Sequence, residues 1–415
     1  MAFEARIAGA EDKLLDSLRF TNRASASYIT SSRNVTFNPS SAAAHKPSGV
    51  RLIRFLLASE SGWVRGPSLR LIFTITNLST QNALTPITDS PASLFRRMRI
   101  IANGSSVVED IESYGRVVQM FSMLDSSQSR YNRVVEGWGG TAAASSLSTP
   151  FTLDAIPASG SRTVCCELLS PFLAQEKHIG LHFLPLTLEL EMADADTAFA
   201  STGNDFEITR PRLVADVVQL ETSIDNSFAL TLKEGKSIPI YSRGIYCVQA
   251  AVPNDSKLYS LAIARGFTRL THIFVSFWDG AGKEVTRFYS PLDTKANTAA
   301  EDTMTYNLTI GSDRFPNFDN ESVGESFYRL RQALMGLRGH ADVSISPAGY
   351  RTNQFVMAQS LEKAPGDAAH TGYNTRSGSQ VMLQLRNTGA TTTVYVVLVH
   401  ETIVNLSAAG VEVLD

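Results

Sequence analysis

The sequence contains too few cysteines for a disulfide-stabilised fold. Its 415 residues include three, Cys165, Cys166 and Cys247. Three thiols cannot form a disulfide framework, and sequence neighbours such as Cys165 and Cys166 rarely bond to each other. Buried strands are therefore the expected positions of these side chains. We expect a protein made in a reducing compartment.

The sequence also lacks an excess of charge of either sign and a long hydrophobic run. Charged residues make up 19% of the chain, and the net charge is −3. A balanced charge gives the folded body no electrostatic reason to bind nucleic acid tightly, and we expect it to recognise no specific nucleic-acid sequence. No stretch approaches the ~20 apolar residues of a membrane-spanning helix. Residues 1–20 are acidic and resemble neither a signal peptide nor a transit peptide, so a soluble protein is expected.

Catalytic motifs are missing as well. Gly235-Lys236-Ser237 resembles the end of a P-loop, but Leu230 stands where the first glycine is needed. The sequence has no G-x-S-x-G and no C-x-x-C motif. We therefore expect no catalytic residue and no cofactor, and predict that the protein is not an enzyme.

Two pairs of residues have spacings that are also found in metal sites. His178 and His182 are four residues apart, but the His-Glu-x-x-His core is absent and the flanking Pro171 and Pro185 disfavour a long helix. Asp194-Ala195-Asp196 is a D-x-D sequence that occurs at metal sites and in ordinary acidic turns. Loop histidines and an acidic turn are the favoured interpretations, and no metal is expected.

What the sequence does contain is a strand pattern followed by a helix pattern at residues 95–124. A strand is predicted at 95–102 and a returning strand at 105–108, joined by Asn103-Gly104, the dipeptide typical of a type I′ turn. From Glu109 the apolar period changes to that of a helix. Its predicted apolar face consists of Ile111, Tyr114, Val118, Phe121 and Leu124. Glu109, Asp110 and Glu112 are expected in its first turn, where carboxylates favour the helix dipole.

A similar unit follows about two hundred residues later. A strand is predicted at 304–310 and a turn at Gly311-Ser312-Asp313. A helix with Val323, Phe327, Leu330 and Leu334 on one face is expected next, capped by Asn320 or Ser322 and ended by Gly336. Two weaker matches pair Val50 with a strand near Ile240, and Glu221-Thr222 with Glu401-Thr402. The repeated order of elements predicts a duplicated domain.

The remaining pattern is of many short strands and long loops, which favours an all-β fold. We predict two tandem eight-stranded antiparallel jelly rolls with short helices in the connecting loops. The expected organisation is an N-terminal arm at 1–30, with a possible helix at 11–20, a first jelly roll at 31–224, a linker at 225–236 and a second jelly roll at 237–415. Residues 125–150 are predicted to be a long irregular loop.

Arg96, Arg97 and Arg99 form a basic cluster with apolar residues between them. Contact with nucleic-acid phosphates is one interpretation. The favoured interpretation is that these arginines make inter-domain or intersubunit contacts or lie in solvent.

Four stretches of the chain resemble a known family. They are HKPSGVRLIRFLLASESGWVRGPSLRLIFTITN (45–77), FRRMRIIANGSSVVEDIESYGRVVQM (95–120), QFVMAQSLEK (354–363) and VYVVLVHETIVNLSAAGVEVLD (394–415). They look like the double jelly-roll major capsid proteins of polinton-like viruses, adintoviruses and related small tailless icosahedral DNA viruses.

The resemblance implies a viral structural protein of the virion. Three copies would form a homotrimer with a pseudo-hexagonal outline, and these capsomers would tile an icosahedral shell. Penton and minor capsid proteins are implied partners, and synthesis is implied in the host cell cytoplasm or nucleus. Loops 125–150 and 290–302 are candidates for the outer surface or for trimer contacts, and the arm for the inner face. Whether an inner membrane lies beneath the shell stays open.

Two alternatives also stay open. One is a two-domain β-sandwich enzyme or carbohydrate-binding protein, which would need aromatic side chains or a carboxylate pair gathered at a concave site. Trp63, Trp138 and Trp278 are dispersed along the sequence. The other is a minor capsid or spike protein, which would differ in oligomer geometry.

Overall fold

A computed structural model describes residues 28–59, 62–138, 154–199, 205–254, 256–278, 290, 304–363, 371–389 and 391–415. The helix predicted at residues 11–20 lies outside these ranges, as do residues 139–150 and 291–302 of the two predicted loops. Among the described helices, none is long and apolar enough to cross a membrane.

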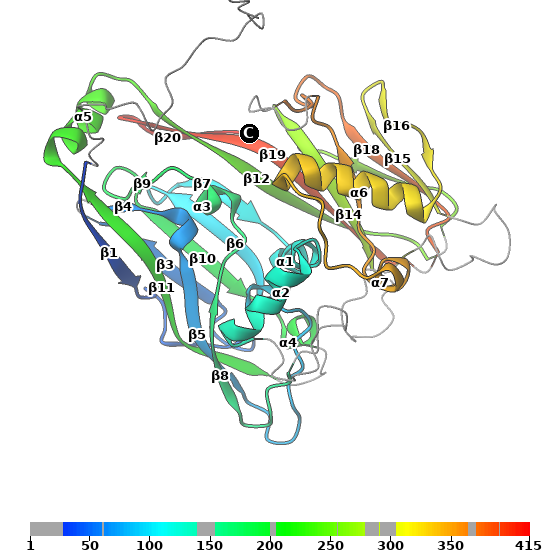
Figure 1. The fold of residues 1–415 in the computed structure, drawn as a ribbon, viewed down its shortest axis with the longest axis horizontal. Helices are drawn as coiled ribbons and strands as arrows, with labels where there is room; N and C mark the ends of the chain where they lie inside the picture. The colour runs from blue at the N-terminus through cyan, green and yellow to red at the C-terminus, as the bar shows by residue number, and fades with distance from the viewer. Residues whose placement is uncertain are drawn as a thin grey trace, which may run out of the picture.

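The first half of the chain forms two antiparallel sheets (Figure 1). In β3 (Leu52–Leu57) and β5 (Arg70–Asn77), more and less buried side chains alternate, which is the strand period read in the sequence. The other strands are β1 (Ile29–Phe37), β2 (Ala44–His45), β4 (Trp63–Val64), β6 (Phe95–Ala102), β7 (Ser106–Ile111), β8 (Ser161–Cys166), β9 (Ile179–Gly180), β10 (Leu186–Met192) and β11 (Phe206–Leu220). The helices are α1 (Tyr114–Met123), α2 (Ser127–Asn132), α3 (Pro171–Ala174) and α4 (Ala195–Ala198), with 3₁₀ turns η2 (Gly66–Ser68), η3 (Pro91–Leu94) and η4 (Arg133–Glu136).

The second half begins after helix α5 (Thr222–Lys233) and contains two further antiparallel sheets. Its strands are β12 (Ile238–Ala251), β13 (Tyr259–Ile263), β14 (Leu270–Trp278), β15 (Thr305–Ile310), β16 (Asp313–Asn320), β17 (Met357–Ser360), β18 (Val381–Arg386), β19 (Thr393–Ser407) and β20 (Gly410–Leu414). Its helices are α6 (Val323–Arg338) and α7 (Pro347–Thr352).

Both halves arrange their strands in the same order. The first half contains the runs β1-β11-β5-β8 and β3-β10-β6-β7, and the second half contains β12-β19-β14-β17 and β13-β18-β15-β16. When the eight main strands of each half are numbered along the chain, both halves read 1-8-3-6 in one sheet and 2-7-4-5 in the other. The first strand pairs with the last, as in a jelly roll. The predicted duplication and the predicted fold class are confirmed.

The shared order also corrects two of the matches made in the sequence. β12 begins at Ile238 and is the first strand of its half, so its counterpart is β1 and not the strand predicted from Val50, which corresponds to the second strand, β3. Glu221 follows β11, whereas Glu401 lies inside β19, so that pair is not equivalent either. The match between Gly104 and Gly311 is correct, because both glycines lie in the turn between the fourth and fifth strands.

The hairpin at residues 95–111 has the predicted turn but a longer second strand. Asn103 and Gly104 have φ values of 50° and 73°, and Ser105 N donates to Ala102 O over 3.2 Å. β7 continues to Ile111 and α1 begins only at Tyr114, with no acidic residue in its first turn. The placement of Glu109, Asp110 and Glu112 in that turn is therefore wrong. Ile111 fits both a strand and a helix period, which hid the boundary in the sequence.

The second helix has the predicted start and a different end. Ser322 caps α6, its hydroxyl accepting a hydrogen bond from Glu325 N, and Gly339 ends the helix with a φ of 74°. Gly336 lies inside α6, at a point where an added Cβ would come within 2.7 Å of the Glu362 carboxylate. Gly336 therefore allows close packing and does not end the helix.

The two halves lie side by side and share one continuous hydrophobic core (Figure 1). Across the contact, the rings of Phe121 in α1 and Phe274 in β14 have centroids 5.4 Å apart. Within the segment predicted to be an irregular loop at 125–150, α2 and η4 occupy residues 127–136. These short helices and α1 lie at the contact between the halves.

Candidate functional site at the junction of the two halves

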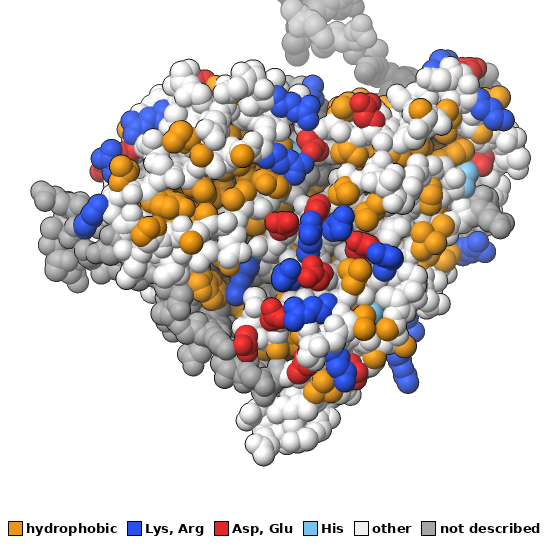
Figure 2. All heavy atoms as spheres, turned by 180° about the vertical axis from the view of Figure 1, so that it is seen from behind, with side chains coloured by type: hydrophobic (Ala, Val, Ile, Leu, Met, Phe, Trp, Pro, Cys, Tyr) orange, Lys and Arg blue, Asp and Glu red, His pale blue; other side chains and the backbone are white. Residues whose placement is uncertain are grey.

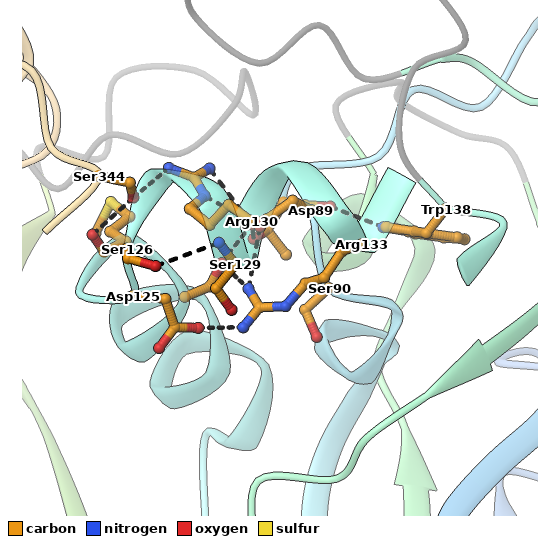
Figure 3. Close-up of polar contacts among 12 residues, drawn as sticks. Asp89, Ser90, Asp125, Ser126, Ser129, Arg130, Arg133, Trp138 and Ser344 are labelled. Atoms are coloured by element: carbon orange, nitrogen blue, oxygen red, sulfur yellow. Dashed lines mark hydrogen bonds and ion pairs between the residues drawn. The ribbon is translucent and has the colours of Figure 1, made fainter. Parts of the chain in front are cut away.

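A buried carboxylate organises the junction on the side of the first half. Asp89 is 3% exposed, and its Oδ2 accepts hydrogen bonds from Arg130 Nε at 3.0 Å and from Arg133 Nη1 at 3.1 Å (Figure 3). The Ser122 hydroxyl of α1 donates to its Oδ1. Trp138 holds the same loop, because its Nε1 donates to Thr88 O over 2.7 Å.

The charge of Asp89 is fixed by its arginine partners. Burial alone would raise the pKa of this carboxyl, but the charges of Arg130 and Arg133 and the hydrogen bond from Ser122 outweigh burial and lower the pKa to about 2. Asp89 is therefore ionised near neutral pH. Such a paired, hydrogen-bonded carboxylate acts as a structural anchor and does not exchange protons near neutral pH.

Two residues of the second half, Ser344 and Arg338, extend this network across the junction. Arg130 Nη1 donates to Ser344 Oγ over 2.9 Å, and Ser344 Oγ donates to Met123 O over the same distance (Figure 3). From the last turn of α6, Arg338 donates to the carboxylate of Asp125 and to Leu124 O. The network therefore joins α1 and α2 of the first half to α6 and the following segment of the second.

A groove of about 1290 Å³ lies between the halves, lined by residues of α1, α2, α3, β12 and β19. Several ionisable side chains along it neutralise one another: Arg133 and Arg338 both pair with Asp125, and Arg269 Nη1 lies 3.1 Å from Glu401 Oε2. Of these pairs, Arg338–Asp125 joins the two halves.

The predicted basic cluster lies on one face of the sheet β3-β10-β6-β7. Along one row across all four strands, Arg54, Glu189, Arg99 and Asp110 stand opposite one another in register. Arg54 Nη2 lies 2.6 Å from Glu189 Oε1, and Arg99 Nη1 lies 3.5 Å from Glu189 Oε2.

The other two arginines of the cluster are also ion-paired. Arg97 Nη2 lies 2.6 Å from Asp110 Oδ2, and Arg96 Nη2 lies 3.2 Å from Glu191 Oε1. Acidic and basic side chains likewise alternate in a band through the middle of the face seen in Figure 2. Arg96, Arg97 and Arg99 thus each have a carboxylate partner within their own sheet.

The other residues singled out in the sequence lie apart from this junction network. His182 Nε2 is 3.2 Å from Asp225 Oδ1 of α5, while burial and the charge of Arg65 lower the pKa of His178. Asp194 is the N-cap residue of α4 and Asp196 lies in its first turn. Among the described residues, no group of three or more His, Cys, Asp or Glu side chains is arranged to hold a metal ion.

The Gly235-Lys236-Ser237 sequence and the cysteines have structural positions. Gly235 follows α5 and precedes β12, the reverse of the strand–loop–helix order of a P-loop. All three cysteines are free and lie on strands, as expected, with Cys166 and Cys247 buried.

The tryptophans do not gather at a common site. Trp63 in β4 packs against Phe228 of α5, Trp138 is fully buried, and Trp278 at the end of β14 lies under the guanidinium of Arg116. The aromatic surface required by the carbohydrate-binding alternative is therefore not formed by these three residues.

The sequence contained little sign of the junction network. Asp89 is an isolated acidic residue in a Thr/Ser/Pro-rich loop, and its partners come from segments 41 and 44 residues away. Arg338 and Ser344 contact residues that are more than two hundred positions away in the sequence. Only the clustering of Arg130 and Arg133 at a three-residue spacing could have suggested a shared acidic partner.

Comparison with known proteins finds similarity in structure alone. No protein-family model matches the chain, and no curated protein matches its sequence. A chain of the PBCV-1 virus capsid is similar over 95% of this chain and 99% of its own length, with a TM-score of 0.63 and 8% identity. The chain has the double jelly-roll fold.

Two further solved structures share this fold over nearly their whole length. The Faustovirus major capsid protein aligns over 95% of this chain and 93% of its own, with a TM-score of 0.58 and 7% identity. The mavirus major capsid protein aligns over 100% of this chain and 95% of its own, with a TM-score of 0.53 and 11% identity. The double jelly roll described here therefore aligns with nearly the full length of these two solved chains.

Proposed function

We propose that this chain is the major capsid protein of an icosahedral DNA virus of the tailless type. The observation that carries the proposal is the double jelly roll itself, which aligns along nearly the full length of the major capsid proteins of Faustovirus and mavirus. The sequence resemblance to polinton-like virus and adintovirus capsid proteins points the same way. The role is structural and not enzymatic.

The junction supports this proposal, because a lattice subunit must present its contact surfaces in a fixed arrangement. Asp89 and its arginines brace α1 and α2, and Arg338 attaches α6 to them. Through this bracing the two jelly rolls act as one building block with two similar halves. Three such blocks have six similar lobes, which is the geometry of a pseudo-hexagonal trimer.

Exposed apolar side chains supply contact surface for such assembly. On the second half, Phe318, Tyr328 and Met335 are more than half exposed. Aromatic residues and methionine are enriched at protein interfaces. A net charge of −3 also limits repulsion between copies in a dense shell.

The proposal places the protein in the virion, made in the cytoplasm or nucleus of the host cell. Its first partner is itself, as a trimer and then as a lattice of trimers. Penton and minor capsid proteins would complete the shell.

The test is the oligomeric state of the purified chain. Light scattering after size exclusion is expected to give three times the 45.1 kDa mass of one chain, and negative-stain images are expected to show particles with a hexagonal outline. A control at tenfold lower concentration distinguishes a stable trimer from loose association. A monodisperse monomer at all concentrations would overturn the proposal, and a spike-like elongated oligomer would favour the minor-protein alternative.

A further inference from the structure

A second, smaller cavity of about 510 Å³ lies where α1 meets the second half. Its walls include the first turn of α1, the start of β6 and the side chains of Gln249 in β12 and Tyr395 in β19. This volume is in the range of small-molecule sites, roughly 300–1000 Å³. Both jelly rolls contribute to it.

Arg116 in the first turn of α1 brings a positive charge to this cavity. Its guanidinium lies 4.2 Å from the centre of the Trp278 ring, and its Nη1 donates to Gln119 Oε1 over 3.0 Å. Burial lowers the pKa of Arg116, and the group that opposes this effect is the Tyr395 hydroxyl. Among the described residues no carboxylate is ion-paired with Arg116, so its charge has neutral neighbours.

The other charged residues of the cavity wall are already balanced. Each basic or acidic side chain there has an oppositely charged partner within 3.5 Å. The pairs are Arg96–Glu191 (3.2 Å), Arg97–Glu112 (3.5 Å) and Arg51–Asp194 (2.8 Å). Among the described residues of the cavity wall, Arg116 is the charged side chain that has no counterion.

Two further features of the wall favour an anion. The Gln119 side chain is 2% exposed, and within the described structure its Nε2 has no hydrogen-bond acceptor. A buried donor without a partner is costly, so a ligand that accepts from it is favoured. The N-terminus of α1 has no side-chain cap and no acidic residue in its first turn, so the positive end of its dipole also favours an anion.

We propose that this cavity binds a small oxyanion, a phosphate or carboxylate group, between Arg116, the Gln119 amide and the first turn of α1. The Arg116 guanidinium supplies the charge, Gln119 Nε2 supplies a buried donor, and Tyr395 and Gln249 close the cavity from the second jelly roll. A bound anion therefore stabilises the contact between the halves. This inference goes beyond capsid assembly and is tested on the isolated chain.

The experiment is a calorimetric titration of the full chain with inorganic phosphate and, separately, with succinate, at constant ionic strength. Saturable binding of one ion per chain is expected. Arg116→Met is expected to weaken it by about tenfold or more, since hydrogen bonds to charged groups contribute about 1.5–3 kcal/mol. Arg386→Met is the matched control, because Arg386 is exposed at the end of β18 and should bind like the wild type.

A second variant keeps the test decisive if Arg116→Met folds poorly. Gln119→Glu places a carboxylate beside the guanidinium and should abolish binding of the added ion while raising the melting temperature in its absence. Preference for phosphate or for succinate identifies the group that the site takes. Absence of saturable binding by either ion, or equal binding by the wild type, Arg116→Met and Gln119→Glu, would overturn the proposal.

Discussion

Arg130 Nε lies 3.0 Å from Asp89 Oδ2 in a buried ion pair that also includes Arg133. Asp89→Asn would keep the shape of the side chain and leave two arginines in a largely buried site without their shared counterion. Removing one partner of a buried pair costs about 3–5 kcal/mol, and the loss in the free energy of unfolding should be of that order. Urea unfolding at neutral pH measures it.

Glu234→Gln is the control for this prediction. Glu234 pairs with Lys236 at 2.8 Å, but both side chains are well exposed, so the expected change is below about 1 kcal/mol. Equal effects of the two substitutions would show that the Asp89 cluster does not anchor the junction.

Glu109 should make the protein less stable as the pH rises. Its carboxyl is buried in β7, where burial raises the pKa to about 8, although the hydrogen bond from Ser170 opposes the shift. In the unfolded chain a glutamate ionises near pH 4.3, so between about pH 4.3 and 8 the folded state holds a proton that the unfolded state has lost. Within this window stability should fall by about 1.4 kcal/mol for each pH unit.

Glu109→Gln tests this dependence, because glutamine is neutral at every pH. The unfolding free energy of the variant, measured in urea at pH 5, 6, 7 and 8, should lack this slope and exceed that of the wild type at pH 8. Glu321→Gln, at an exposed position before α6, should retain the wild-type slope. If Glu109→Gln also retains it, Glu109 is ionised in the folded protein.

The Asn103-Gly104 turn should be sensitive to any side chain at position 104. Gly104 has a φ of 73°, and an added Cβ would have no heavy atom within 4 Å, so the cost of Gly104→Ala is purely conformational. A loss of about 1–2 kcal/mol is expected, and Gly104→Val should lose more and lower the yield of folded protein. Gly324→Ala is the matched control for Gly104→Ala. It also adds a Cβ in open space, but inside α6, where alanine favours the helix. Thermal unfolding should show a lower melting temperature for Gly104→Ala and a higher one for Gly324→Ala.

Arg338 should couple the unfolding of the two jelly rolls. It contacts Leu124 O and Asp125, and its guanidinium lies 5.7 Å from the centre of the Phe121 ring, so all three contacts cross to the first half. Arg338→Ala should lower the melting temperature and broaden or split the calorimetric transition. Arg331→Ala, exposed on the same helix, should leave a single transition. A sharp single transition in Arg338→Ala would mean that the remaining contacts, the shared hydrophobic core and the hydrogen bonds of Ser344, couple the halves without Arg338.

Local patterns predicted those parts of the fold that depend on local forces. Apolar patterns indicated the strands at 95–102 and 304–310, and the Asn103-Gly104 turn and the Ser322 cap follow from short-range geometry. The start of α1 was misplaced because Glu109 and Asp110 look like first-turn carboxylates. Glu109 is instead bonded to Ser170, which lies far away in the sequence, and Asp110 is bonded to Arg97 on the neighbouring strand β6.

The junction could not be predicted, for the same physical reason. Asp89 depends on arginines from a segment that resembled a loop, and Arg338 depends on a carboxylate more than two hundred residues away. Pairwise contacts of this kind leave no periodic signal in a single sequence. The cavity beside Arg116 depends in the same way on Tyr395 and Gln249 from the other jelly roll.

The pairing of first and last strands sets when each jelly roll can close during synthesis. β1 pairs with β11 from Ile29 opposite Leu220, and β12 pairs with β19 from Ile238 opposite Leu406. The first roll can complete its sheet once its last strand has left the ribosome, while the second is still being made. Until β19 emerges, β12 lacks the strand with which it pairs and β14 exposes one edge on the nascent chain, and shielding them from neighbouring chains is a requirement for productive folding.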